Sequence, residues 1–504
     1  MRTIAGVLAF LAVSLPSMLV AATPCAELSN MRLSAGRIDS AKVIDKGAFQ
    51  PPQNSPGTTT YETLPAFCRV TATLVPTPDS DIKIEVWLPT SGWNGKYQGV
   101  GNGGWAGTVS YAALARAVAD GYAAASTDTG HVGPTAAFAV GHPEKLVDFG
   151  YRAIHEMTVH AKTITEKFYG RPTSEAIFNG CSQGGRQGIT EAERFPSDYD
   201  AIVAGAPGIY NMEINVARVA LNRFVNRTAT SAVPKEKYAL VHDAVLKACD
   251  ANDGVVDGVL ENPLQCAFNP QTLACKDADG PSCLTHEQVE TVRAMYSPIA
   301  HPQSGKRLSP PLLQPGTELA WNILAGPKPV STAFEGVRYI TFADATWDAT
   351  QFNPKTDIDK SLAADHDVLS LTDPNLRPFF QRGGKLLMYH GWQDPQVPAQ
   401  NTTRYFNEIV KTLGREVVGT SVQLFMVPGM NHCSGGPGTD TFDMVRAIEQ
   451  WRQSGQAPTH IVAAHRTNGA VDRTRPLCTY GQTARWSGTG NSDEAANFSC
   501  VASR

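Results

Sequence analysis

Polar and apolar side chains alternate along residues 82–88, where Lys83 and Glu85 lie between apolar neighbours. A period of two is typical of a β-strand with one polar face. Further apolar runs predict strands at 96–100, 201–204, 385–389 and 422–427, one strand that ends near 127 and another around 177. Helical periodicity predicts helices between them, at 112–120, 144–169 and 185–194. Strands that alternate with helices predict an α/β fold, whose doubly wound, mostly parallel sheet is covered by helices on both faces.

The alternation of strands and helices breaks down between about Pro207 and Leu371. This stretch holds four cysteines, many prolines and an Asp-rich loop. We therefore expect a large inserted lid domain at 209–371, between the two parts of a catalytic domain at 23–208 and 372–504.

The start of the chain has the pattern of a secretory signal peptide at 1–22, with an early basic residue, an apolar stretch and small residues before the expected cut. No other apolar run is long enough to cross a bilayer, so no membrane partner is expected. A net charge of −4 and a pI near 6.3 give no reason to expect nucleic acid as a partner. We expect a secreted or periplasmic protein whose oligomeric state the sequence leaves open.

Export permits stable disulfides, and the ten cysteines can pair completely. Their spacing favours four pairs and leaves one further pair, giving Cys25–Cys68, Cys249–Cys266, Cys275–Cys283, Cys478–Cys500 and Cys181–Cys433. The alternative for Cys181 is a free or nucleophilic thiol.

Residues 180–184, Gly-Cys-Ser-Gln-Gly, follow a predicted strand and precede a predicted helix. That is the setting of a nucleophile elbow, which exposes a serine hydroxyl at a sharp turn, and Ser182 is the candidate nucleophile. His432 is the candidate base because it follows the strand 422–427, and Asp394 is the candidate acid because it follows the strand 385–389. The order Ser, Asp, His is that of α/β-hydrolases.

Two alternatives to this triad stay open. Asp365 and Asp367 also lie between the serine and the histidine, but no predicted strand precedes them. The glycines and His432 can also be a coincidental turn and a surface histidine. A bond between Cys181 and Cys433 would fasten the base beside its nucleophile.

Acyl transfer needs N–H donors directed at the developing oxyanion. The elbow supplies the backbone N–H of Gln183, and the glycine-rich loop at 101–105 offers Gly104, or Gly103 as the alternate. The same glycines match the dinucleotide-binding pattern G-x-G-x-x-G, with Asp128 downstream. The next predicted helix begins too far from these glycines to meet a pyrophosphate, which counts against an oxidoreductase.

The Asp-rich loop at 250–258 concentrates Asp250, Asp253 and Asp257, and hard oxygen ligands suit calcium. The alternative is a solvated acidic turn.

His155 and His160 are five residues apart, whereas a zinc-protease helix places its histidines four apart, so packing or surface roles are expected. The inserted stretch has aromatic residues that can line a pocket, although core packing is their commoner use, namely Trp321, Trp347, Phe342 and Phe352.

With Ser182 beside Cys181, Asp394, and His432 beside Cys433, the chain resembles the tannase/feruloyl esterase family over nearly all of residues 23–504. The resemblance implies an α/β-hydrolase fold with a lid, and hydrolysis of phenolic-acid esters such as feruloyl, other hydroxycinnamoyl or galloyl esters. It also implies a structural Ca²⁺ in the lid, with an expected ligand set of the side chains of Asp250, Asp253 and Asp257 and the carbonyls of Val255 and Val259.

We therefore expect a secreted serine esterase that forms an acyl-enzyme on a small aromatic ester substrate. One alternative is a hydrolase of mono-esters from aromatic polyester breakdown. Val397 stands where that branch of the family has an aromatic residue, and no equivalent of its carboxylate-binding arginine is evident. Another alternative is a phenolic- or carbohydrate-binding protein on an inactive hydrolase scaffold.

Overall fold

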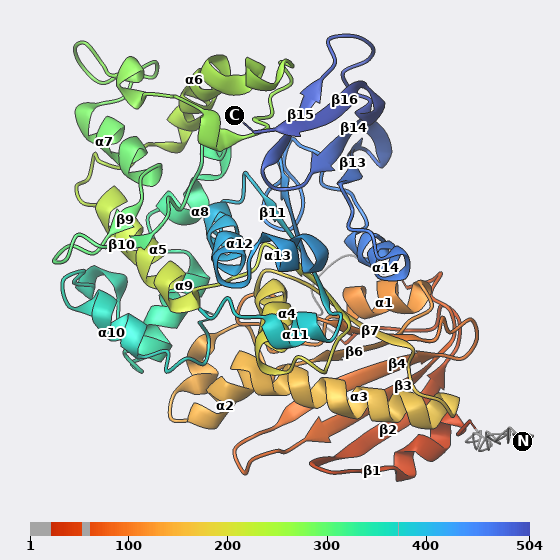
Figure 1. Cartoon of the computed structure of the whole chain (residues 1–504). Coiled ribbons are helices and arrows are strands. Elements are labelled where there is room, and N and C mark those ends of the chain that lie inside the picture. Colours follow the sequence, from red (N-terminus) through yellow and green to blue (C-terminus); the bar gives the residue numbers. More distant parts are fainter. Residues whose placement is uncertain (1–21, 53–60, 371, 504) are drawn as a thin grey trace, which may run out of the picture.

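A computed structural model describes residues 22–52, 61–370 and 372–503 (Figure 1). The expected signal peptide therefore lies outside the described residues, apart from residue 22. In the described part of the chain, no helix combines the length and apolar character needed to span a bilayer.

The centre of the molecule is a ten-stranded sheet in the order β1-β2-β3-β4-β6-β5-β7-β8-β11-β12. The strands β1 to β4 and β6 pair antiparallel, whereas β6, β5, β7, β8, β11 and β12 pair parallel. Their bounds are β1 Arg32–Leu33, β2 Gly36–Ile44, β3 Phe67–Leu74, β4 Ile82–Pro89, β5 Lys96–Val100, β6 Ala123–Thr127, β7 Glu175–Cys181, β8 Ala201–Gly205, β11 Lys385–Gly391 and β12 Val422–Val427.

Helices cover both faces of this sheet (Figure 1). One face packs against α3 (Ala153–Tyr169), α4 (Gln183–Arg194) and α12 (Ala399–Leu413), and the other against α1 (Tyr111–Ala119) and α14 (Met444–Ser454). Each face has its own apolar core, because successive side chains of a strand point to opposite sides. Ile84 and Val86 of β4 belong to one core, and Trp87 belongs to the other.

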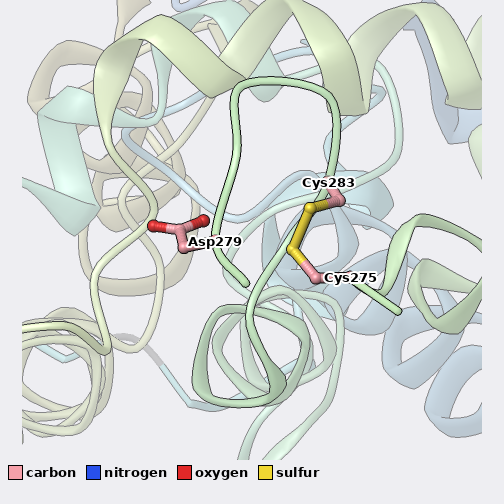
Figure 2. Close-up of side chains that lie close together, drawn as sticks. All are labelled: Cys275, Asp279 and Cys283. Carbon is pink, nitrogen blue, oxygen red and sulfur yellow. A yellow bond between two sulfur atoms is a disulfide. The ribbon is translucent and has the colours of Figure 1, made fainter. Parts of the chain in front are cut away.

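The inserted stretch forms a separate apolar core from residues between Val216 and Ile358. Its helices are α5 Asn211–Val225, α6 Tyr238–Cys249, α7 His286–Met295, α8 Asn322–Ala325, α9 Ser331–Glu335 and α10 Asp357–Ala363, and β9 (Ile299–Ala300) pairs with β10 (Arg307–Ser309). The disulfide Cys275–Cys283 closes a short loop here (Figure 2). Asp279 on that loop pairs at 2.5 Å with Nζ of Lys237, whose side chain is nearly buried, and this pair anchors the loop within the inserted stretch.

The C-terminal part adds two hairpins, β13 (His460–Thr467) with β14 (Ala470–Cys478) and β15 (Gln482–Trp486) with β16 (Phe498–Ala502). The shorter helices α2 (Pro143–Val147), α11 (Arg377–Gln381) and α13 (Arg415–Ser421) complete the elements named in Figure 1. Five disulfides join the same cysteine pairs that the spacing favours.

Two features of the sheet differ from the sequence expectation. The antiparallel strands β1 to β3 were not predicted from the sequence, and β3 is buried on both faces without a clean alternation. The polar face of the strand at 82–88 is solvated only in part, since the side chain of Lys83 is 44% exposed but Glu85 is only 6% exposed. Arg69 of β3 neutralises that carboxylate across the strand pair, with its Nε 2.8 Å from Oε2 of Glu85.

Candidate active site

The nucleophile candidate Ser182 lies between the end of β7 and the first residue of α4. Its backbone has φ 63° and ψ −122°, a conformation that costs energy for a residue with a side chain. Bare glycines make this turn possible. A Cβ on Gly180 would lie 2.5 Å from the backbone of Gly184, and a Cβ on Gly185 would lie 2.2 Å from the carbonyl oxygen of Gly205. The sequence therefore folds here into the sharp bend expected of a nucleophile elbow.

A disulfide connects the serine segment to the histidine segment. Cys181 and Cys433 are bonded, with their Cα atoms 6.1 Å apart, although 252 positions separate them in sequence. In the chain-entropy model, closing so long a loop contributes about 5 kcal/mol to stability. Ser182 and His432, the residues adjacent to the two cysteines, line one cavity of about 340 Å³.

The acid candidate Asp394 lies in the loop after β11 and is 2% exposed. Its Oδ2 lies 2.6 Å from Nδ1 of His432, and its Oδ1 accepts the backbone N–H groups of Gln396 at 2.7 Å and Val397 at 2.8 Å. Burial alone would raise the pKa of Asp394, but the facing imidazoles of His432 and His390 hold that pKa well below its usual range. The carboxylate therefore stays charged, and the Nδ1 proton of His432 points toward it.

The structure adds His390, a residue that sequence reasoning missed. His390 is fully buried, and its Nε2 lies 3.0 Å from Oδ2 of Asp394 and 3.2 Å from the carbonyl oxygen of Val397. Two acceptors face Nε2, so that nitrogen carries the proton, and Nδ1 accepts from the hydroxyl of Thr402 at 2.7 Å. Its spacing of four residues from Asp394 was visible in the sequence, but nothing there indicated that both side chains turn inward.

The remaining cavity lining combines oxyanion-hole candidates with an aromatic wall. Gln183, Gly103 and Gly104 all line the cavity. As the first residue of α4, Gln183 has no intrahelical acceptor for its backbone N–H. Trp105 and Phe149 stack with their ring centroids 5.0 Å apart and form part of the same wall.

The competing acids lie elsewhere. Asp365 accepts the backbone N–H groups of Leu369 and Ser370, each at 2.9 Å, and has no bond to His432. Asp367 lies at an exposed position, where its backbone carbonyl oxygen accepts from Arg194. The geometry therefore favours Asp394 as the partner of His432.

The dinucleotide pattern has a structural explanation in the packing of the elbow. A Cβ on Gly101 would lie 2.5 Å from the Cα of Gly184, so this glycine permits the close approach of its loop to α4. The carboxylate of Asp128 instead accepts the backbone N–H groups of Lys83 and Gly130, each at 2.9 Å.

The two histidines of α3 pair with separate carboxylates. His155 Nδ1 lies 2.6 Å from Asp198, and His160 Nε2 lies 3.5 Å from Glu156. The lid aromatics Trp321, Trp347 and Phe352 are buried in the lid core, as expected for packing residues, and Phe342 packs against that core.

The Asp-rich loop supplies the oxygen atoms of the candidate cation site. Asp250 and Asp253 fold back onto the loop, accepting N–H groups from Gly258 at 3.0 Å and Val255 at 2.9 Å. Burial and the neighbouring carboxylates of Asp257 and Asp250 raise the pKa of Asp253 to about 6. A cation bound near these partly buried carboxylates would favour their ionised form. Asp257 also pairs with Arg475 at 2.7 Å, which neutralises part of the charge.

Comparisons with known proteins agree with this geometry. The sequence model of the family described as tannase and feruloyl esterase matches residues 68–501. An uncharacterized esterase of Xanthomonas campestris is 33% identical, with 99% of this chain and 94% of the relative covered. A probable feruloyl esterase B-1 of Aspergillus flavus is 31% identical, with 88% of each chain covered. Among solved structures, feruloyl esterase B from Aspergillus oryzae matches with a TM-score of 0.89 at 29% identity, over 95% of this chain and 99% of the other.

The fold is that of an α/β-hydrolase, and the chain belongs to the tannase and feruloyl esterase family. It is a carboxylic ester hydrolase.

We predict that His390→Leu lowers kcat for a simple methyl ester about tenfold with little change in KM. The reason is that Asp394 loses a donor worth about 1.5–3 kcal/mol, and with it part of its hold on His432. His390→Gln offers an amide N–H in the same place and should recover much of the loss. Steady-state kinetics on both variants, with Tm recorded for each, test this. An unchanged kcat in the leucine variant, or a glutamine variant no better than leucine, contradicts it.

Proposed function

We propose that this protein hydrolyses esters of phenolic acids, such as feruloyl, other hydroxycinnamoyl or galloyl esters, through an acyl-enzyme on Ser182. The observation that carries the proposal is the arrangement around one cavity: Ser182 and His432 line it together, and His432 is bonded to Asp394. Relatives named feruloyl esterase and the stacked aromatic pair in the cavity wall support a phenolic acyl group.

The proposed reaction has two steps. His432 takes the proton of the Ser182 hydroxyl, and Ser182 Oγ attacks the ester carbonyl carbon. The N–H of Gln183 and an N–H from Gly104 or Gly103 stabilise the oxyanion, while Asp394 stabilises the imidazolium. The alcohol leaves with the proton from His432. His432 then activates a water molecule, which releases the phenolic acid and restores Ser182.

We also propose a structural calcium ion in the lid, held by the carboxylates of Asp250, Asp253 and Asp257 and the carbonyls of Val255 and Val259. The ion would neutralise the neighbouring carboxylates and fix the loop next to the Cys249–Cys266 disulfide.

Five disulfides fit an oxidising compartment, which supports the proposal that the protein is exported to the periplasm or the exterior.

Replacement of the nucleophile tests the mechanism. We expect Ser182→Ala to lower turnover of phenolic methyl esters at least about a thousandfold, as loss of a triad nucleophile does. Labelling by a serine-reactive phosphonate should disappear in the same variant, while Tm stays near that of the native protein. The measurement is hydrolysis of methyl ferulate, methyl gallate, methyl caffeate and a terephthalate mono-ester. A folded Ser182→Ala variant with near-native turnover would rule out the proposed nucleophile, and preference for the terephthalate ester would favour the polyester alternative.

The Cys181–Cys433 disulfide should matter for catalysis beyond stability. In Cys181→Ala/Cys433→Ala, the His432 loop is no longer tied to the elbow, so we expect kcat to fall about tenfold or more even where the variant is folded. The matched control is Cys478→Ala/Cys500→Ala, which removes another disulfide from residues outside the catalytic cavity. Kinetics are measured at a temperature where circular dichroism shows both variants folded. Equal kcat in the two double variants contradicts the expectation.

Removal of calcium should destabilise the protein. After chelation we expect Tm to fall by about 5 °C, and added Ca²⁺ should restore it, because an ion that binds only the folded state stabilises that state. Asp253→Asn should abolish the calcium-dependent shift, whereas Asp277→Asn, at an exposed position in the lid, should retain it. A native protein whose Tm does not respond to chelation and Ca²⁺ contradicts the site.

A further inference from the structure

Arg218 of α5 is a buried cation in the wall of the catalytic cavity. The residue is only 6% exposed. Among the described residues, no carboxylate forms a salt bridge with its guanidinium. Its hydrogen bonds go to neutral oxygens: the carbonyl of Gln396, Oδ1 of Asn215 at 3.3 Å and Oγ1 of Thr332 at 3.5 Å. Its Nε has no partner.

A charged side chain that is removed from water normally has a partner of opposite charge, because burial of an isolated ion is costly. Burial lowers the pKa of Arg218 to about 10, a value at which the guanidinium remains a cation at neutral pH. The charge of Arg218 interacts with the carboxylate of Asp394 without a direct bond. That carboxylate already accepts four hydrogen bonds, from His432, His390 and two backbone N–H groups. The positive charge of Arg218 is therefore only partly compensated, at a surface that a substrate touches.

The other residues of the cavity indicate which kind of ligand group can compensate the charge of Arg218. Trp105 and Phe149 are 4% and 1% exposed and offer an apolar aromatic wall, and Ile214 and Val397 add aliphatic surface. The polar residues Asn215 and Thr332 lie beside Arg218 and contact it. A planar ring that packs against the apolar wall can thus place an oxygen substituent against the guanidinium.

We propose that Arg218, supported by Asn215 and Thr332, binds the ring oxygen substituents of the acyl group and so determines which aromatic acids the enzyme accepts. The inference rests on the proposed hydrolysis of phenolic-acid esters and adds the residue that recognises the phenol. A guanidinium N–H donates to the phenolic oxygen. A ring without oxygen substituents leaves this donor unpaired, and buried polar sites discriminate strongly against ligands that lack the matching group.

The test compares two methyl esters that differ only in ring oxygens, methyl caffeate and methyl cinnamate. The native enzyme should have the higher kcat/KM for caffeate. Arg218→Met should lower kcat/KM for caffeate about 10- to 100-fold more than for cinnamate, the effect of one hydrogen bond to a charged group. Arg218→Lys keeps the charge without the planar fork of donors and should show an intermediate loss for caffeate.

Arg223→Met is the matched control, since this arginine lies on the same helix but lines a separate cavity in the lid. It should leave both esters unaffected. If Arg218→Met lowers kcat/KM equally for both esters, Arg218 only supports Gln396 and the loop that carries Asp394, and the inference is overturned. The inference would also be overturned if the loss of kcat/KM in Arg218→Met depended on the alcohol part of the ester, which a comparison of methyl ferulate with a feruloyl sugar would show. If the native enzyme hydrolyses neither methyl ester, the proposed function itself fails.

Discussion

The covalent bond between Cys181 and Cys433 is the constraint on which the arrangement of the candidate catalytic residues depends. Ser182 and Cys433 both have positive φ angles, 63° and 65°, so each of the two segments that the bond joins contains a backbone conformation that L-residues rarely adopt. Strained backbone persists where the surrounding structure fixes it. Here the glycines of the elbow remove clashes on one side, and the disulfide holds the histidine loop on the other. Two strands that are not neighbours in the sheet, β7 and β12, thus present their loops to one cavity.

Buried charge is the second organising feature of the site. Asp394 is held ionised by four donors, of which two come from backbone and two from imidazoles. The shared oxygen Oδ2 receives both imidazoles, so the orientation of His432 is tied to a histidine that lies entirely in the interior. Arg218 of α5 donates a hydrogen bond to the carbonyl oxygen of Gln396, two residues after Asp394. The loop that carries the acid is therefore held between the central sheet and the first helix of the lid.

The cavity lies between the central sheet and the inserted stretch. Its candidate catalytic groups come from loops at the carboxyl ends of parallel strands, where ligands bind in open α/β sheets. Its opposite wall comes from α5 and α9, which pack in the core of the inserted stretch. Variation in the inserted stretch can therefore alter which acyl group fits without disturbing the chemistry on the sheet.

Local signals in the sequence were sufficient for the central strands, the elbow, the pairing of the cysteines and the identity of Ser182, Asp394 and His432 as candidates. The strands, the elbow and the three candidates depend on short-range patterns: an apolar run, a glycine turn, or a polar residue directly after a strand. The cysteine pairs instead came from the spacing of the ten cysteines, with Cys181–Cys433 as the pair that remained. Tertiary structure alone decided that His390 turns toward Asp394, that Arg218 is buried beside the acid loop, and that Trp105 stacks on Phe149. It also decided that Glu85 is buried, because its partner Arg69 comes from a strand that the pattern did not reveal. The physical reason is the same in each case: a charged or aromatic side chain can be buried only beside a partner, and packing brings that partner from a distant part of the chain.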